Sequence, residues 1–157
     1  MPRPPIDTSR TRCTSLHRAS CCSAIRYGTG VTIEFARHAS AAGLIVEDAY
    51  TSVADRGQEV FPVLPIRLIA RSRFASIDKV GALRLPKLFL HARNDRTIPI
   101  EHGRKLFAAA SEPKEFVELN AGHADAYAAD RVCYYGAIDA FIRSVTASSP
   151  VVATVPR

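Results

Sequence analysis

The feature that most constrains this chain is a continuous apolar segment that ends abruptly in polar residues. Leu88, Phe89 and Leu90 follow one another without the alternation of a half-exposed strand. Unbroken apolar runs of this kind are typical of strands that are covered on both faces, as in parallel sheets. The polar pair Asn94-Asp95 comes soon after, and then a proline and an acidic residue lead into a helical pattern. The sequence therefore predicts that Asp95 lies in a loop between a strand and a helix.

Strands and helices alternate over most of the chain. We expect strands at Gly43–Glu47, within 87–93 and at 114–120, with a small helical excursion between the first two at 51–85. Helical patterns precede the first strand, follow the second and close the chain. This order predicts an α/β fold, with a parallel sheet, right-handed crossovers and flanking helices.

The N-terminal segment, residues 1–26, does not match this pattern. It is rich in Arg, Ser, Cys and Pro, and it shows no sustained period of 2 or 3.6. We expect a disordered or mismatched segment at 1–26, the domain at 27–146 and a loose tail at 147–157.

Charge and cysteine content limit the partners. Residues 1–30 hold five Arg and one Asp, so they carry +4 of the formal net charge of +6 and leave +2 for the remainder. The Arg-rich start lacks interleaved aromatic residues, so we expect no nucleic-acid partner. Four cysteines without an apolar secretory segment predict a reducing, cytoplasmic location. Cys13, His17, Cys21 and Cys22 lack the paired C-x-x-C spacing of structural zinc sites, so we expect no metal and no cofactor.

Two residues stand at equivalent places in this pattern. Asp95 follows the second predicted strand, and His123 follows the third, inside Ala121-Gly122-His123. An acid and then a histidine after consecutive parallel strands is the order in which α/β hydrolases place their triad acid and base. A histidine takes a proton from a serine hydroxyl only when its other nitrogen is held in the right tautomer, and a carboxylate does this. Asp95 would orient His123.

The stretches "GLIVEDAYTS", "LPKLFLHARNDRTIPIEHGRKLFAAA" and "FVELNAGHAD" resemble the C-terminal half of serine hydrolases of the α/β-hydrolase fold, in the Bem46-like and serine-aminopeptidase-like branches. The resemblance covers roughly 27–145. It implies a partial α/β-hydrolase fold that contains the last three strands of the parallel sheet. It also implies hydrolysis of an ester, thioester or amide bond in a small-molecule acyl or peptide substrate.

The nucleophile of this family lies on a G-x-S-x-G elbow, and the matching place here is Ala24-Ile25-Arg26-Tyr27-Gly28. Arg26 stands where the serine belongs, and a protonated guanidinium cannot attack a carbonyl. Only the backbone N–H of Tyr27 would remain of the oxyanion hole. We therefore expect no activity from this chain. The alternative is a non-catalytic remnant or a binding protein.

The genetic code offers an explanation for the missing serine. Read from one nucleotide upstream, the codons for Cys21 to Arg26 permit an apolar strand followed by Gly-x-Ser. Removal of one base near the Arg26 codon then rejoins the downstream sequence as G-x-S-Y-G. Our hypothesis is that residues 1–26 are an out-of-frame translation of the family's upstream strand and elbow.

The remaining expectations concern packing. We take His91 as a satisfied interior residue and His17, His38 and His102 as surface residues. The Gly43–Glu47 strand is expected to expose an edge through which the chain self-associates, because its preceding neighbour is missing. For the segment at 51–85 we expect ordinary packing on the sheet. We favour this over two alternatives, a lid that covers an acyl pocket and a helix that touches a membrane.

Overall fold

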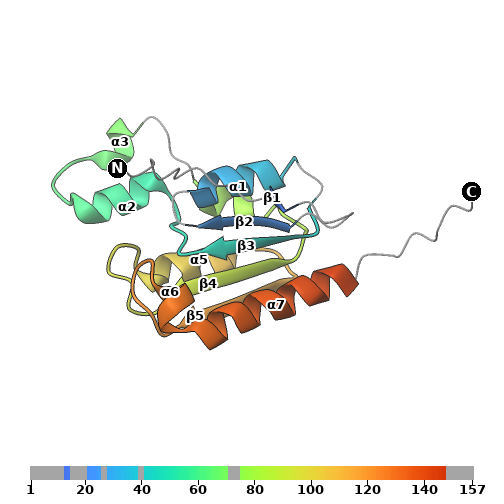
Figure 1. Ribbon diagram of the computed structural model, residues 1–157. Helices are drawn as coiled ribbons and strands as arrows, with labels where there is room; N and C mark the ends of the chain where they lie inside the picture. Colours follow the sequence, from blue (N-terminus) through green and yellow to red (C-terminus); the bar gives the residue numbers. More distant parts are fainter. Residues whose placement is uncertain (1–12, 15–20, 26–27, 39–40, 71–74, 148–157) are drawn as a thin grey trace, which may run out of the picture.

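One mixed β-sheet forms the centre of the protein (Figure 1). The computed structural model describes residues 13–14, 21–25, 28–38, 41–70 and 75–147. The strand order in the sheet is β1-β2-β3-β4-β5; β1 pairs with β2 in the antiparallel sense, and all the other neighbours are parallel. The strands are β1 Cys13–Thr14, β2 Cys21–Ile25, β3 Gly43–Glu47, β4 Lys87–Ala92 and β5 Lys114–Leu119.

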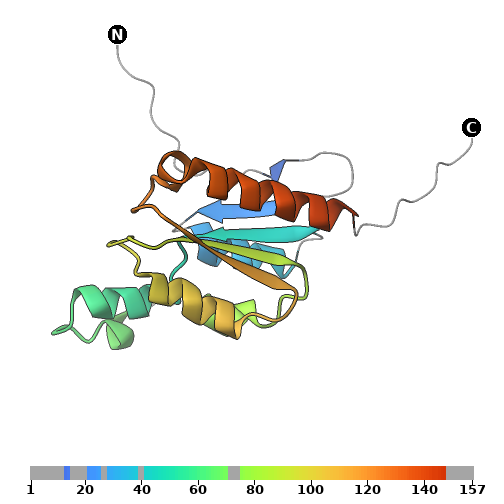
Figure 2. The same cartoon turned by 90° about the horizontal axis from the view of Figure 1, so that it is seen from below.

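Helices cover both faces of the sheet, which is why β3 and β4 are buried along their whole length. One apolar layer joins Leu44, Val46 and Phe89 to α1, α4 and α5. The opposite layer joins Ile45 and Leu90 to α6 and α7. Figure 2 shows α7 on one side of the sheet and α5 on the other. The helices are α1 Thr29–Ala36, α2 Val53–Val60, α3 Ile66–Ile69, α4 Ile77–Val80, α5 Ile100–Ala109, α6 Ala126–Ala129 and α7 Arg131–Ala147.

The expected fold class is confirmed. The three predicted strands are β3, β4 and β5, and they pair in parallel, in chain order, with helices between them. Strands β1 and β2 were not expected, and both lie inside the N-terminal segment 1–26. The other residues of that segment, and 148–157 of the predicted tail, lie outside the described residues.

The edge expected at β3 is not exposed, so that prediction is wrong. All five residues of β3 are in parallel register with β2, from Cys21 opposite Gly43 to Ile25 opposite Glu47. The ladder is made by backbone N–H and C=O groups, which every non-proline residue has, so an unusual composition does not prevent the pairing. Self-association through β3 would first require β2 to leave.

The segment between β3 and β4 is helical, as predicted, but only part of it packs on the sheet. Val80 of α4 is fully buried in the core. Helices α2 and α3 instead project beyond one end of the sheet (Figures 1 and 2). Large apolar side chains of this projection are exposed, including Val63 at 93% and Leu68 at 86%. None of the helices in the described part of the chain is long and apolar enough to cross a bilayer.

Candidate active site

Three polar side chains meet where the parallel strands end. Asp48 follows β3, Asp95 follows β4 and His123 follows β5. In open α/β sheets this carboxyl edge is where ligands bind, because the loops that leave adjacent strands converge there.

Asp95 and His123 are in direct contact. His123 Nδ1 lies 2.8 Å from Asp95 Oδ2. An ionised carboxylate can only accept hydrogen bonds, so in this pair Nδ1 donates and carries the proton. The Asp95 side chain is fully buried, whereas that of His123 is 24% exposed. The contact therefore holds the imidazole in one tautomer and leaves part of the ring accessible.

The second oxygen of Asp95 is held by its own loop. Oδ1 accepts hydrogen bonds from the backbone N–H groups of Thr97, at 2.7 Å, and Ile98, at 2.9 Å. A carboxylate oxygen that accepts two N–H groups is fixed in direction. The loop after β4 thus presents Oδ2 to His123.

The loop that carries His123 is also tied down. Asn94 N donates to Ala121 O at 3.0 Å, which joins the loops after β4 and β5. Gly122 N donates to Asp125 Oδ1 at 2.8 Å, and Ala124 has a positive φ of 74°. Asp125 therefore supports the turn around His123.

Sequence reasoning missed Asp48. It has a positive φ of 45°, its residue is 1% exposed, and its Oδ1 accepts the backbone N–H of Ala92 at 3.0 Å. Oδ2 is buried, and it has no hydrogen-bond partner among the described residues. Burial raises the pKa of this carboxyl above its usual value. The signal available in the sequence was position, since Asp48 directly follows a predicted strand, as a triad acid does.

Asp48, His91 and Asp95 also form a group of potential metal ligands, with donor atoms all within 4.8 Å of one another. Most of these atoms already have partners. Both oxygens of Asp95 are occupied, and His91 Nε2 lies 2.9 Å from Ile98 O, to which it must donate. A metal ion would have to displace these bonds, so the group is better described as a hydrogen-bonded cluster. The prediction that His91 is interior and satisfied is confirmed, since it is 1% exposed.

The prediction that His102 is a surface residue is wrong. It is 2% exposed, and its Nδ1 accepts the backbone N–H of Thr51 at 3.3 Å. Its Nε2 therefore carries the proton and donates to Glu59 Oε2 at 2.9 Å. His102 lies one helical turn before the buried Leu106, and this i, i+4 spacing was the signal for an inward-facing residue. His102 joins α5 to α2.

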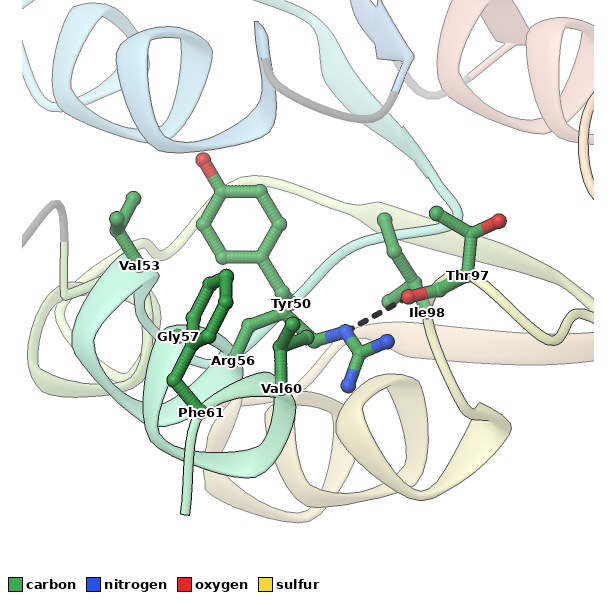
Figure 3. Close-up of a pocket in the computed structure, with 8 residues that line it drawn as sticks. All are labelled: Tyr50, Val53, Arg56, Gly57, Val60, Phe61, Thr97 and Ile98. Carbon is green, nitrogen blue, oxygen red and sulfur yellow. Dashed lines mark hydrogen bonds between the residues drawn. The ribbon is translucent and has the colours of Figure 1, made fainter. Parts of the chain in front are cut away.

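An apolar pocket of about 240 Å³ adjoins the Asp95 loop (Figure 3). Thr97 and Ile98, whose N–H groups hold Asp95, form one side of it, and α2 forms another. Arg56 Nε donates to Thr97 O at 2.7 Å across these two sides. The lining residues are Tyr50, Val53, Arg56, Gly57, Val60, Phe61, Thr97 and Ile98.

The expected nucleophile position is flanked by the elements that an elbow requires. Strand β2 ends at Ile25, and Gly28 is the N-cap of α1, so 26–27 lie between a strand and a helix. Arg26 and Tyr27 themselves lie outside the described residues.

Sequence comparisons give distant relatives. No protein-family model matches the chain. Two uncharacterized proteins of Mycobacterium tuberculosis strains are 30% identical to it over 99 residues, which are 62% of this chain and 35% of theirs. WAV2 of Arabidopsis thaliana, an alpha/beta hydrolase domain-containing protein, is 28% identical over 109 residues, 59% of this chain and 35% of WAV2. The chain thus spans about a third of the length of the curated relatives it matches.

Solved structures show the fold. A thermophilic esterase from Thermogutta terrifontis superimposes with a TM-score of 0.61 at 19% identity, covering 81% of this chain and 65% of the esterase. Pyrococcus horikoshii acylaminoacyl peptidase superimposes with a TM-score of 0.64 at 11% identity, covering 87% of this chain and 25% of the peptidase. The chain therefore has part of an α/β-hydrolase fold, and this part corresponds to the C-terminal portion of the complete fold.

Proposed function

We propose that this chain carries the acid and the base of a serine-hydrolase triad, with Asp95 as the acid and His123 as the base. The observation that supports it most directly is the 2.8 Å contact between His123 Nδ1 and Asp95 Oδ2 at the carboxyl edge of the sheet. The fold shared with esterases favours hydrolysis as the chemistry of the intact site. The substrate class would be an ester, thioester or amide, cleaved through an acyl-enzyme.

The contacts suit these two roles. With Nδ1 protonated, the Nε2 of His123 is the basic nitrogen that would take a proton from a serine hydroxyl and later return it to the leaving group. Asp95 would stabilise the imidazolium that forms, and its full burial strengthens that interaction by excluding water. The two N–H groups on Oδ1 prevent the carboxylate from turning away.

We also propose that this chain alone does not turn over substrate. The elbow position holds Arg26, and the backbone N–H of Tyr27 would be the single remaining oxyanion donor. Without the serine, a triad loses its covalent route. The alternative function is a non-catalytic protein that binds small molecules or partners, and the apolar pocket beside Asp95 is the observation that favours it.

Fluorophosphonate labelling and p-nitrophenyl butyrate hydrolysis test both parts. The natural chain is expected to show neither above the buffer rate. The Arg26→Ser variant supplies the missing hydroxyl and is expected to gain labelling, which His123→Ala in the same background abolishes.

Turnover by the natural chain that disappears in His123→Ala would defeat the proposed inactivity. Labelling of Arg26→Ser that survives His123→Ala would defeat the proposed base. An unlabelled Arg26→Ser variant would count against the nucleophile position.

A further inference from the structure

The pocket beside the Asp95 loop is built from apolar side chains of separate parts of the chain. Tyr50 comes from the loop after β3, Val53 and Val60 from α2, Phe61 from the end of that helix, and Ile98 from the loop after β4. Figure 3 shows these side chains around one hollow. An engineered apolar cavity of roughly 150 Å³ binds benzene, so about 240 Å³ has room for a short alkyl chain or a substituted ring.

Among the described residues that line the pocket, Arg56 is the one charged side chain, and its charge is paired. Arg56 donates from Nε to Thr97 O at 2.7 Å and from Nη1 to Glu59 Oε2 at 3.2 Å. Figure 3 shows its guanidinium directed toward Thr97. Because the charge of Arg56 is paired with Glu59, the pocket has little to offer a carboxylate and suits an uncharged ligand.

The α2 wall of the pocket is held from three sides. Arg56 ties it to the Asp95 loop, and Glu59 accepts from His102 Nε2 of α5 at 2.9 Å. Gly57 permits close packing on α3, since a Cβ there would lie 2.8 Å from Ile66 Cγ2. A wall fixed in this way is formed before the ligand arrives, which reduces the entropy cost of binding.

Apolar side chains continue from the lining to the surface. Val53, Val60 and Phe61 are 39%, 49% and 53% exposed. Exposed apolar side chains that border a hollow are typical of ligand-binding sites.

We infer that this pocket binds the uncharged apolar part of an acyl compound, a short alkyl chain or an aromatic ring. That the ligand is an acyl compound rests on the proposed function. Thr97 and Ile98 line the pocket, and their backbone N–H groups donate to Asp95, the carboxylate that holds His123. The binding itself requires neither a nucleophile nor turnover. The chain would therefore retain a ligand site even though it lacks the serine.

Titration of the full chain with methyl hexanoate, followed by ¹H–¹⁵N NMR, tests this inference. We expect saturable shifts of the amides of 53–61 and 97–98, with a dissociation constant on the order of 1 mM. Hexanoate, the anionic counterpart, should bind more weakly.

Two matched pairs of variants separate the pocket from general surface adhesion. Val60→Asn places an amide in the lining and should weaken binding by about fivefold or more, whereas Val63→Asn, outside the lining and 93% exposed, should leave it within about twofold. Phe61→Gln and Leu68→Gln repeat the comparison. All four positions are about half exposed or more, so the fold should tolerate the polar side chains.

Three results would overturn the inference: no saturable shift, tighter binding of hexanoate than of methyl hexanoate, or equal weakening within each pair. None of these results bears on the Asp95–His123 pair, whose test is labelling of the Arg26→Ser variant. Failure of that labelling would likewise leave the binding measurement intact.

Discussion

Asp95 uses each carboxylate oxygen for a different purpose. Oδ1 is fixed by the backbone of its own loop, and Oδ2 is presented to His123. Because the two oxygens have different partners, a substitution can remove the charge of Asp95 while the side chain keeps its direction.

Asp95→Asn should reverse the tautomer of His123. The amide oxygen can keep the two backbone donors, so the amide nitrogen faces Nδ1 and donates to it, which moves the ring proton to Nε2. We expect this change in histidine ¹⁵N correlation spectra recorded at the same pH for the variant and the natural chain, because these spectra distinguish a ring nitrogen that carries a proton from one that does not. The free energy of unfolding should fall by about 1–3 kcal/mol.

Asp125→Asn is the matched control for this variant. Its amide oxygen can still accept from Gly122 N, so His123 should keep the proton on Nδ1. A proton on Nδ1 of His123 in Asp95→Asn would contradict the assigned orientation of the pair.

Asp48→Asn should stabilise the protein more at high pH than at low pH. Because burial raises the pKa of Asp48 in the folded state, the stability it contributes is fully present below about pH 3.8 and is lost as the pH rises through the folded value. Asn stays neutral, can accept from Ala92 N through Oδ1 and tolerates the positive φ of this position.

The measurement is the difference in unfolding free energy between Asp48→Asn and the natural chain at about pH 4 and pH 8. From the lower pH to the higher pH, we expect this difference to change in favour of the variant by on the order of 1 kcal/mol. The charged and titratable neighbours His91, Asp95, His123 and Tyr134 are present in both proteins, so the two proteins differ only in the side chain at position 48. A difference that does not change with pH would show that Asp48 ionises normally.

At the scale of elements, α5 approaches β4 closely at one point. A Cβ at Gly103 would lie 2.4 Å from His91 Nδ1. His91 cannot easily yield, because it is buried and its Nε2 is bound to Ile98 O. The glycine therefore sets how near the helix lies to the strand that positions Asp95.

Gly103→Ala should destabilise the protein by about 1–3 kcal/mol through overpacking. Gly136→Ala is the matched control, since a Cβ on α7 at this position meets nothing within 4 Å. Alanine there should stabilise the helix by about 0.5–1 kcal/mol. Urea unfolding measures both, and a Gly103→Ala variant as stable as Gly136→Ala would contradict the packing of α5 on β4.

At the scale of the whole molecule, the chain combines the Asp95–His123 contact with an N-terminal segment in which Arg26 stands at the place where the sequence analysis expects a serine. Its coding DNA tests whether that segment is an out-of-frame translation. We expect a TCG codon for Ser23, ATT for Ile25 and a CGN codon for Arg26, with the shifted frame open upstream. These choices follow from the genetic code, because only they spell G-x-S in the shifted frame and leave a surplus base near Arg26. An AGY codon at Ser23 would exclude the hypothesis, since the shifted frame could not then encode the glycine.

The sequence by itself determined the three parallel strands β3, β4 and β5 and the places of Asp95 and His123 at their ends. These features are local: an apolar run, a turn and a polar residue just past it lie within a few positions of one another. The contact between Asp95 and His123 followed from them, because adjacent parallel strands end at the same edge of a sheet.

Only the tertiary structure decided the pairing of β2, the burial of His102, the position of Asp48 against the Asp95–His123 pair, and the pocket. Each depends on groups far apart in the chain; His102, for example, binds Thr51 and Glu59, which lie 51 and 43 residues away. Side-chain periodicity shows which face of an element is apolar, but not which distant element covers it. The pairing of β2 rests on backbone groups that are the same in every non-proline residue, so side-chain patterns do not reveal it.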